Sequence, residues 1–223
     1  MVGICFFAPF DHTEDGRMAL AEREGVFERF GDGERHRIDK ISNPSGKALS
    51  LGGLCALGRA FNAMGVSAPS MSIVRDKLGK PHFEYGAPYF SISHAGKLSV
   101  AAVSEDGELG VDIEHVDRER DTERIAGKFF SEAEQKRLDA AADDRTAEFY
   151  RIWTAKEAMM KLSGGGMTSV MSSDCVLAEE SGERSFARYA ISFEGEEYIL
   201  TLCTLGTEQT KIFSCEGVSV SAL

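Results

Sequence analysis

The sequence has no apolar run approaching the ~18 residues that a membrane-spanning helix needs, so no transmembrane helix is predicted. It also lacks a cationic leader, because the start, MVGICFFAPFDHTEDG, has a short apolar stretch that acids follow at once. We therefore predict a first β-strand there rather than a signal peptide. The 223 residues, 43% of them hydrophobic, suffice for one large domain or two small ones with a buried core.

Closely spaced cysteine pairs of the kind that bind zinc are missing as well. The chain has no CxxC motif and no even pairing among its five cysteines, which are Cys5, Cys55, Cys175, Cys203 and Cys215. This pattern favours reduced thiols over a disulfide framework or a zinc site, and it predicts a cytoplasmic protein.

Charge is unevenly distributed along the chain. Residues 1–105 carry 12 basic and 12 acidic residues, whereas residues 106–223 carry 13 and 24, so the second part holds the whole net charge of −11. Residues 37–80 contain seven basic residues and only two acidic ones. This balance disfavours broad nucleic-acid binding and favours a small, highly anionic ligand at one basic patch. A solvated charged face is the alternative explanation.

Two segments of similar design follow one another. In the first, NPSGKALSLGGLCALGRAFNAMG predicts a helix that Ser45 caps and Gly65 stops, and YFSISHAGKLSVAAVS predicts two strands joined by a turn. In the second, Ser131 and Glu134 form a capping-box pattern, a helix through WTAKEAMMKLS ends at the glycines 164–166, and strand signals follow. The two hairpin segments align loosely. We expect an α+β fold of two similar halves, residues 1–105 and 106–223.

The motif GVDIE, residues 110–114, places two carboxylates on one face of a strand. Successive side chains of a strand alternate, so Asp112 and Glu114 point one way while Val111 and Ile113 point the other. The α-carbons of the two acids lie about 6.6 Å apart at ~3.3 Å per residue. Such a pair can bind Mg²⁺. An amphipathic strand whose acids face water is the alternative.

The segment SISHAG is expected to present Ser91, Ser93 and His94 where a strand turns, so that hydroxyl groups, backbone N–H groups and an imidazole come together. A histidine with a pKa near neutrality can donate a hydrogen bond to a phosphate. A histidine bonded within its own turn is the alternative. A turn with the sequence GKP, residues 79–81, precedes this segment and indicates little alone.

In WTAKEAMMK, residues 153–161, three side chains lie on one helix face at spacings of four, namely Trp153, Glu157 and Lys161. Lys156 lies on a neighbouring face. Taken alone, the motif predicts a buried tryptophan beside a surface Glu–Lys ion pair. The motifs that precede it in the chain change this interpretation.

Together, GKP, SISHAG, GVDIE and WTAKEAMMK resemble the 4′-phosphopantetheinyl transferases, specifically the larger, surfactin-synthetase-activating type that forms a pseudo-dimer within one chain. The signature of this family is a G-[IV]-D-[IVL]-E strand followed some forty residues later by W-x-x-K-E-x-x-x-K, and both motifs are complete here. The resemblance spans about residues 35–170. One departure is Ala95, since many relatives have Ser or Thr there, which would remove one hydrogen bond to a phosphate.

The resemblance implies two α/β halves related by a pseudo-twofold axis in one chain, each a helix packed on antiparallel strands, and hence a monomer. It implies transfer of the phosphopantetheine arm of coenzyme A to a serine of an apo carrier protein, acyl or peptidyl, with release of adenosine 3′,5′-bisphosphate. Mg²⁺ is the implied cofactor, and neither nucleic acid nor a membrane is expected as a partner.

The resemblance also implies roles for individual residues. Asp112, Glu114 and Glu157 are expected to bind Mg²⁺, and Glu157 is also the expected base toward the incoming serine. Lys161 is expected to neutralise charge on the phosphates, and to pair with Glu157 when the site is empty. Lys156 is expected to touch a phosphate or to position Glu157. The coenzyme A contacts are expected at Lys40, Lys47, Gly79, Lys80, Pro81, Ser93, His94, Asp112, Lys156 and Lys161, with Arg37 as an alternate.

The carrier protein is expected to dock near the charged segment 115–130, beside Phe129 and Phe130. Carriers of this kind are usually acidic around the modified serine, so four basic residues are expected to face it: Arg118, Arg120, Arg124 and Lys128. Two alternatives stay open, a coenzyme A-binding protein that regulates without transfer and a Mg²⁺-dependent phosphohydrolase. The complete metal and lysine motifs argue against the first, and no separate water-positioning motif supports the second.

Overall fold

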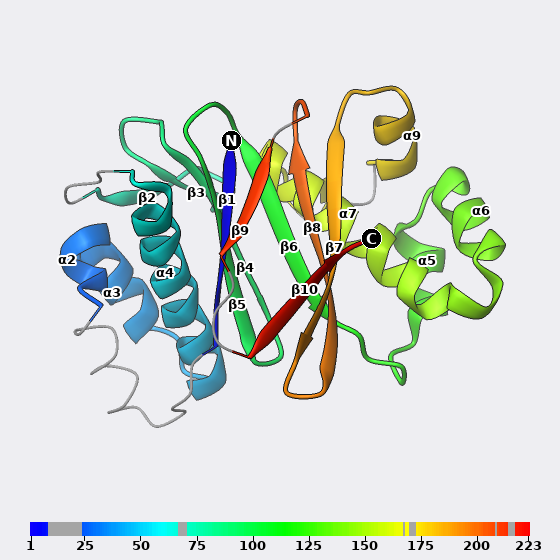
Figure 1. Cartoon of the computed structure of the whole chain (residues 1–223), viewed down its shortest axis with the longest axis horizontal. Coiled ribbons are helices and arrows are strands. Elements are labelled where there is room, and N and C mark those ends of the chain that lie inside the picture. Colours follow the sequence, from blue (N-terminus) through cyan, green and yellow to red (C-terminus); the bar gives the residue numbers. More distant parts are fainter. Residues whose placement is uncertain (9–23, 67–70, 167, 170–172, 208, 214–216) are drawn as a thin grey trace. The chain divides into compact units, whose positions relative to one another are not determined.

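The computed structural model describes residues 1–8, 24–66, 71–166, 168–169, 173–207, 209–213 and 217–223 (Figure 1). The chain forms two compact units. The first contains Met1–Gly107 with Gln209–Glu216, and the second contains Glu108–Glu208 with Gly217–Leu223. The expected halves, residues 1–105 and 106–223, did not include this return of a C-terminal segment to the first unit.

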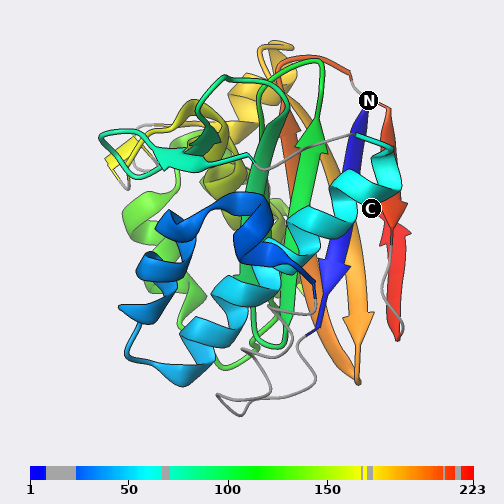
Figure 2. The same ribbon diagram turned by 90° about the vertical axis from the view of Figure 1, so that its left-hand side faces the viewer.

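The first unit is built on a four-stranded sheet with the strand order β4-β5-β1-β9. Strand β1 pairs antiparallel with β5 and parallel with β9. Figure 2 shows helix α4 lying along one face of this sheet, where it packs on β5, β1 and β4. The elements are β1 Val2–Phe7, α2 Val26–Phe30, α3 Asp32–Asp39, α4 Pro44–Met64, β2 Ile73–Arg75, β3 Pro81–Phe83, β4 Tyr89–Ala95, β5 Leu98–Ser104 and β9 Thr210–Phe213.

The core of the first unit lies between α4 and the sheet. Aromatic rings fill its centre, with ring centroids of Phe83 and Phe90 4.6 Å apart and those of Phe61 and Phe83 5.6 Å apart. Glycine at position 53 allows the helix to pack closely, because a Cβ there would lie 2.6 Å from Cγ2 of Ile92. Close packing therefore explains the glycine at this position inside the helix.

The ends of α4 agree with the sequence at one terminus and differ at the other. Gly65 ends the helix in the left-handed conformation, with φ 70°, as predicted. The N-cap is Asn43, whose side chain accepts a hydrogen bond from the Ser45 N–H, so the prediction of Ser45 as the cap was wrong. Pro44 occupies the first helical turn, where its missing N–H costs nothing, and this places the cap one residue before it.

The second unit is a four-stranded antiparallel sheet with the strand order β10-β7-β8-β6. Helix α7 packs on β6 and β8, and α5, α6 and α9 pack on α7. The predicted capping box is confirmed at the start of α6, where Ser131 and Glu134 exchange hydrogen bonds. The elements are β6 Leu109–His115, α5 Thr122–Phe129, α6 Glu132–Ala140, a 3₁₀ turn Ala142–Asp144, α7 Arg145–Ser163, α9 Cys175–Glu180, β7 Ser185–Phe193, β8 Glu196–Thr204 and β10 Val218–Ala222.

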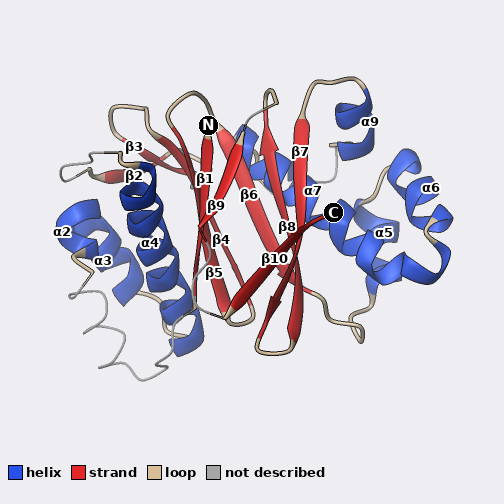
Figure 3. Ribbon diagram, in the orientation of Figure 1, coloured by secondary structure: helices blue, strands red, loops and turns tan. Residues whose placement is uncertain are grey.

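Both units repeat one chain order of strand, helix and hairpin (Figure 3). The series β1–α4–β4–β5 of the first unit corresponds to β6–α7–β7–β8 of the second. In each unit the second strand of the hairpin pairs antiparallel with the first strand of the series. The mixed α/β fold predicted from the sequence is therefore confirmed, and each unit shows a helix packed on antiparallel strands.

Two expectations drawn from missing features can be compared with the described residues. None of the described helices is both long and apolar enough to cross a membrane. The four described cysteines are buried and form no disulfide: Cys5, Cys55, Cys175 and Cys203. Burial raises the pKa of Cys203 to about 12, so this thiol keeps its proton. Cys215 lies outside the described residues.

Candidate active site

Strand β6 supplies the first two acidic side chains of the site. It runs antiparallel to β8, with Asp112 opposite Thr201 and Glu114 opposite Ile199. The alternating apolar residues of this strand, Val111 and Ile113, are fully buried, and their burial fixes the register of the strand. Asp112 is only 2% exposed, and Glu114 keeps about a quarter of its side chain in solvent. The alternation predicted for GVDIE is thus present.

Helix α7 crosses β6 at Gly110, and the closeness of this crossing forms the site. A Cβ on residue 110 would lie 1.9 Å from the carbonyl oxygen of Ala158 and 2.6 Å from the backbone nitrogen of Leu162. Only glycine, which has no Cβ, fits at this position; any other residue would force the helix or the strand to move. Because Glu157 and Lys161 immediately precede the two contacted residues, the crossing carries both side chains to the strand.

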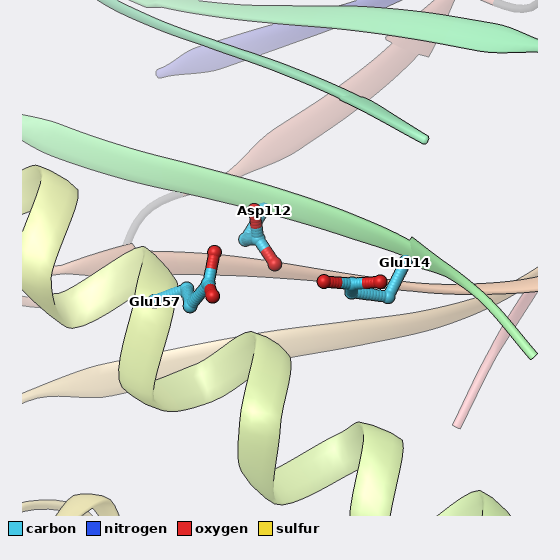
Figure 4. Close-up of side chains that lie close together, drawn as sticks. All are labelled: Asp112, Glu114 and Glu157. Atoms are coloured by element: carbon cyan, nitrogen blue, oxygen red, sulfur yellow. The ribbon is translucent and has the colours of Figure 1, made fainter. Parts of the chain in front are cut away.

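Glu157 completes a group of three carboxylates with Asp112 and Glu114. One oxygen of each side chain lies within 4.8 Å of the other two. Figure 4 shows Asp112 and Glu114 extending from the strand and Glu157 from the helix, with their carboxylates converging. A group of carboxylate oxygens is the donor set that Mg²⁺ prefers, so the residues fit the cation that the sequence implied.

Lys161 lies one helical turn beyond Glu157 and pairs with the strand. Its ammonium nitrogen is 2.7 Å from Oδ1 of Asp112, and a quarter of its side chain is exposed. Helical spacing alone had favoured Glu157 as the ion-pair partner. The correction follows from the close crossing of α7 over β6, which places a buried carboxylate within reach of the lysine.

Glu114 is bonded through both of its oxygens. Trp153 donates from Nε1 to one oxygen at 3.2 Å, and Arg120 donates from Nη1 to the other at 3.2 Å. The tryptophan ring packs parallel to Phe149, with centroids 6.3 Å apart, and edge-on to Phe129 at 5.5 Å. The carboxylate of Glu114 is therefore fixed by donors that are themselves packed.

Glu157 and Glu114 both have raised pKa values. Burial, together with the charge of Asp112, raises the pKa of Glu157 to about 8, although Lys161 partly opposes this. Burial and Asp112 likewise raise the pKa of Glu114, with Arg120 opposing. A divalent cation would relieve the same repulsion, so the electrostatics also fit metal binding.

Lys156 has a different partner from the one that the sequence suggested. Its side chain is fully buried, and its ammonium lies 2.7 and 3.0 Å from the two oxygens of Glu134 and 2.5 Å from the carbonyl oxygen of Ser173. An ammonium with no exposed surface cannot touch a phosphate in this conformation. The phosphate contact expected of Lys156 is therefore corrected, and the residue anchors α7 to α6.

The GKP turn lies in the first unit, between β2 and β3. Gly79 adopts φ 92°, a left-handed conformation that glycine favours, and Pro81 begins β3. The carboxylate of Asp76 accepts hydrogen bonds from the backbone N–H groups of Leu78 and Lys80, which lowers its pKa. The turn is therefore a braced hairpin that leaves the Lys80 side chain partly exposed.

Ser93 and His94 also lie in the first unit, within strand β4 rather than at a turn. Adjacent residues of a strand point to opposite faces, and accordingly Ser93 is 6% exposed whereas His94 is exposed. The expectation that these two side chains are presented together was wrong, because the strand continues to Ala95 before it turns.

The basic residues expected near the 3′-phosphate belong to the first unit as well. Lys40 is exposed at the end of α3, and Lys47 lies in the first turns of α4 with its side chain partly buried. The alternate, Arg37, pairs with Glu34 at 2.8 Å. The structure thus brings together the expected metal and catalytic residues in the second unit and holds the expected nucleotide contacts in the first.

The four basic residues expected to face a carrier protein have unequal surroundings. Arg124 is 84% exposed on α5, and Lys128 lies 5.0 Å from the ring centroid of Phe129 on the same helix. Arg118 is exposed and pairs with Glu197 at 3.0 Å. Arg120 is only 30% exposed and contacts Glu114, so this residue lies beside the three carboxylates rather than on an open surface.

Sequence reasoning missed two contacts of the site. The bond from Arg120 to Glu114 arises in an irregular connection after β6, where neither helical nor strand periodicity assigns a direction. The pair between Glu134 and Lys156 joins two helices, and its only sequence signal is the capping box that places Glu134 at the start of α6.

Comparison with known families and proteins agrees with this geometry. Residues 108–203 match the family described as "4'-phosphopantetheinyl transferase superfamily". This range contains the three carboxylates, Lys161, Arg120 and Trp153. It covers the helices and three of the four strands of the second unit.

Individual proteins show the same likeness. The chain is 38% identical over 134 residues to "4'-phosphopantetheinyl transferase AcpT" of Salmonella typhimurium, covering 59% of this chain and 66% of the relative. It is 36% identical over 119 residues to the protein of the same name from Escherichia coli K12, covering 52% and 60%. It is 30% identical over 154 residues to "4'-phosphopantetheinyl transferase" of Bacillus subtilis, covering 61% and 65%. The chain thus spans just under two thirds, or less, of each relative.

The close crossing at Gly110 predicts a large effect for a single methyl group. Gly110→Ala forces α7 away from β6, so it should destabilise the protein by about 1–3 kcal/mol or more. It should also abolish stabilisation by Mg²⁺, because Glu157 moves with the helix. Urea unfolding with and without Mg²⁺ measures both effects. Gly107→Ala is the matched control, since nothing lies within 4 Å of a Cβ there. Equal behaviour of the two variants would contradict the prediction.

The raised pKa of Glu157 predicts a pH-dependent stability of the metal-free protein. The folded state keeps a proton on this carboxyl up to a pKa of about 8, whereas the unfolded chain releases it near its ordinary value, so the stability contributed by this group is lost as pH rises between the two. Glu157→Gln removes that loss. Relative to the native protein, its midpoint of thermal unfolding in a chelator should rise between pH 5 and pH 8.

Added Mg²⁺ should reverse that order of stability. It should raise the unfolding midpoint of the native protein at pH 8 and leave that of Glu157→Gln nearly unchanged, because the variant lacks one carboxylate ligand. If the unfolding midpoints of the two proteins in the chelator changed in parallel with pH, the pKa of Glu157 would not be raised in the folded state, and the prediction would be wrong.

Proposed function

We propose that this protein belongs to the 4′-phosphopantetheinyl transferase superfamily, whose family model matches residues 108–203. We further propose that it transfers the 4′-phosphopantetheine group of coenzyme A to a serine of an apo carrier protein. Adenosine 3′,5′-bisphosphate is the other product. The observation that carries the proposal is the convergence of Asp112, Glu114 and Glu157 within 4.8 Å, with Lys161 bonded to Asp112. The names of the aligned relatives support the same activity.

The reaction exchanges one phosphorus–oxygen bond for another. The serine oxygen bonds to the phosphorus that carries pantetheine, while the bond from this phosphorus to the bridging oxygen of the pyrophosphate breaks. Adenosine 3′,5′-bisphosphate leaves with that oxygen and the electron pair of the bond. Bound at the three carboxylates, Mg²⁺ would neutralise charge on the pyrophosphate and polarise it.

Side chains of the second unit serve the remaining needs of the reaction. Glu157 lies on the helix face that meets the strand, where it can accept the proton of the serine hydroxyl. Lys161 offers an ammonium group, partly exposed, to the negative charge that grows on the departing bisphosphate. Asp112 orients that ammonium through a bond of 2.7 Å. Lys156 acts indirectly, by fixing α7 through Glu134.

Coenzyme A carries a second anionic group, the 3′-phosphate, which needs its own partners. We assign the nucleotide contacts to residues of the first unit: Lys40, Lys47, Gly79, Lys80, Pro81, Ser93 and His94. The repeated chain order of the two units supports the single-chain type of enzyme, in which two halves related by a pseudo-twofold axis complete one site in a monomer. We also propose that the protein is cytoplasmic, because its cysteine pattern favours reduced thiols.

A direct assay of transfer tests the proposal. The protein is incubated with coenzyme A, Mg²⁺ and an apo carrier protein, and the carrier is weighed by mass spectrometry. We expect the mass increment of one phosphopantetheine on the carrier, and we expect Glu157→Gln to reduce the rate by at least ~100-fold, because proton acceptance and a metal ligand are lost together. Full activity in that variant would remove Glu157 from both roles.

The same assay separates the two alternatives. Binding of coenzyme A with no mass increment on any of several carriers, acyl and peptidyl, would indicate a regulatory binding protein. Release of adenosine 3′,5′-bisphosphate in the absence of a carrier, at the rate seen in its presence, would indicate a hydrolase. The identities of the carrier and of its pathway follow from which carriers gain mass.

A carrier with acidic residues around its serine needs a basic surface, and α5 supplies one. Arg124 is highly exposed there, with Lys128 one turn further along the helix. We expect Arg124→Glu with Lys128→Glu to raise KM for the carrier at least ~10-fold and to leave KM for coenzyme A within about twofold, because exposed charges chiefly steer encounter. Arg118→Glu is the comparison, since this residue lies outside α5, in the connection that follows β6. Equal changes in both KM values would contradict docking at α5.

A further inference from the structure

The carboxylate of Glu114 is held by two donors that come from different parts of the second unit. Trp153 of α7 donates to Oε1, and Arg120 of the connection after β6 donates to Oε2, each at 3.2 Å. In Figure 4, one oxygen of Glu114 is turned toward Asp112 and Glu157, and the other is turned away from them. The side chain therefore presents its carboxylate end-on to the acidic group.

Both donors are fixed in place by packing. Trp153 is 5% exposed and contacts the rings of Phe129 and Phe149. The guanidinium carbon of Arg120 lies 5.9 Å from the ring centroids of both Trp153 and Tyr150. These contacts oppose rotation of the Glu114 carboxylate about its terminal bond, because rotation would break a hydrogen bond in a largely buried site.

The connection that carries Arg120 is itself tied to α7. The hydroxyl of Tyr150 donates to the carbonyl oxygen of Asp117 at 3.1 Å and accepts from the N–H of the same residue at 3.0 Å. One side chain of α7 thus fixes the backbone three residues before Arg120, and the next turn of the helix supplies Trp153. The two donors keep their spacing because a single helix positions both.

End-on presentation matters differently to different cations. Mg²⁺ requires six ligands in a near-octahedral arrangement at ~2.0–2.1 Å and takes one oxygen from each carboxylate. Ca²⁺ takes six to eight oxygens at ~2.3–2.6 Å and commonly uses both oxygens of a carboxylate. A carboxylate that cannot turn can give Mg²⁺ the one oxygen that it takes, but it cannot give Ca²⁺ both oxygens.

We propose that Arg120 and Trp153 are positioning residues that select Mg²⁺ over Ca²⁺ by holding Glu114 to ligation through one oxygen. This inference rests on the metal site of the proposed function. It assigns Arg120 a role other than carrier docking. It also explains why a positively charged guanidinium group lies beside carboxylates that bind a metal cation. The orientation that the guanidinium imposes on Glu114 offsets the repulsion that its charge adds.

Charge and orientation can be separated by comparing two cations of equal charge. Loss of the Arg120 guanidinium removes the same repulsion for Mg²⁺ and for Ca²⁺, so this effect cancels in the ratio of their affinities. Loss of orientation weakens Mg²⁺ binding and permits Ca²⁺ to use both oxygens of Glu114. The ratio therefore reports on geometry, which a merely structural role of Arg120 would not change.

The test uses the full chain with MgCl₂ or CaCl₂ alone, without coenzyme A or a carrier. Titrations followed by calorimetry and by the midpoint of thermal unfolding give the two dissociation constants. The variants are Arg120→Gln and Trp153→Phe, which keeps an aromatic ring but loses the N–H donor. Arg124→Gln is the matched control, because this arginine is 84% exposed on α5. Circular dichroism checks that each variant is folded.

We expect the native protein and Arg124→Gln to bind Mg²⁺ more tightly than Ca²⁺. Each of the two test variants should lower the ratio of Mg²⁺ to Ca²⁺ affinity by about 10-fold, the lower end of the range for outer partners of metal ligands. A ratio that stays within about twofold of the native value in either folded variant, or a native protein without preference for Mg²⁺, would overturn the inference. Transfer is measured separately, so a native protein that transfers but shows an unchanged ratio in the variants refutes this inference alone.

Discussion

The crossing of helix α7 over strand β6 is the contact on which the rest of the site depends. At Gly110 the two backbones approach so closely that a methyl group would overlap a carbonyl oxygen. A side chain of ordinary size at this position would separate helix and strand and thereby the two sources of carboxylates. The acidic group is therefore a product of backbone packing first and of side-chain chemistry second.

Other contacts hold α7 in the rotation that this crossing requires. On the side toward the sheet, the hydroxyls of Thr154 and Thr201 bond at 2.7 Å, both fully buried. On the side toward α6, Lys156 pairs with Glu134, which also accepts from the N–H groups of Ser131 and Cys175. A buried ion pair adds little net stability, but loss of one partner costs ~3–5 kcal/mol because the other charge is left unpaired. The pair therefore specifies orientation more than it adds stability.

The sequence predicted the parts of the site that local periodicity determines. The alternation of GVDIE and the four-residue spacing in WTAKEAMMK each follow from one element, and the resemblance to a family joined them. Contacts that depend on the meeting of two elements were not predictable from the pattern. Lys156 is the clearest example. The helical periodicity that places Glu157 does not indicate that the neighbouring lysine pairs with Glu134, a buried carboxylate on α6. His94 was expected in a turn, but the strand continues to Ala95, so His94 and Ser93 point to opposite faces of the sheet.

Strand β9 has a consequence for the order in which the chain can fold as it is synthesised. Residues Thr210–Phe213 pair with β1 at the edge of the first sheet, yet the ribosome makes them only after most of the second unit. Until then β1, the second strand from that edge, exposes one row of unpaired backbone groups, which is the kind of edge that recruits foreign strands. The nascent first unit must therefore remain incomplete while about a hundred further residues emerge. A fragment that ends at Gly107 would lack β9 and would leave this edge of the sheet unpaired.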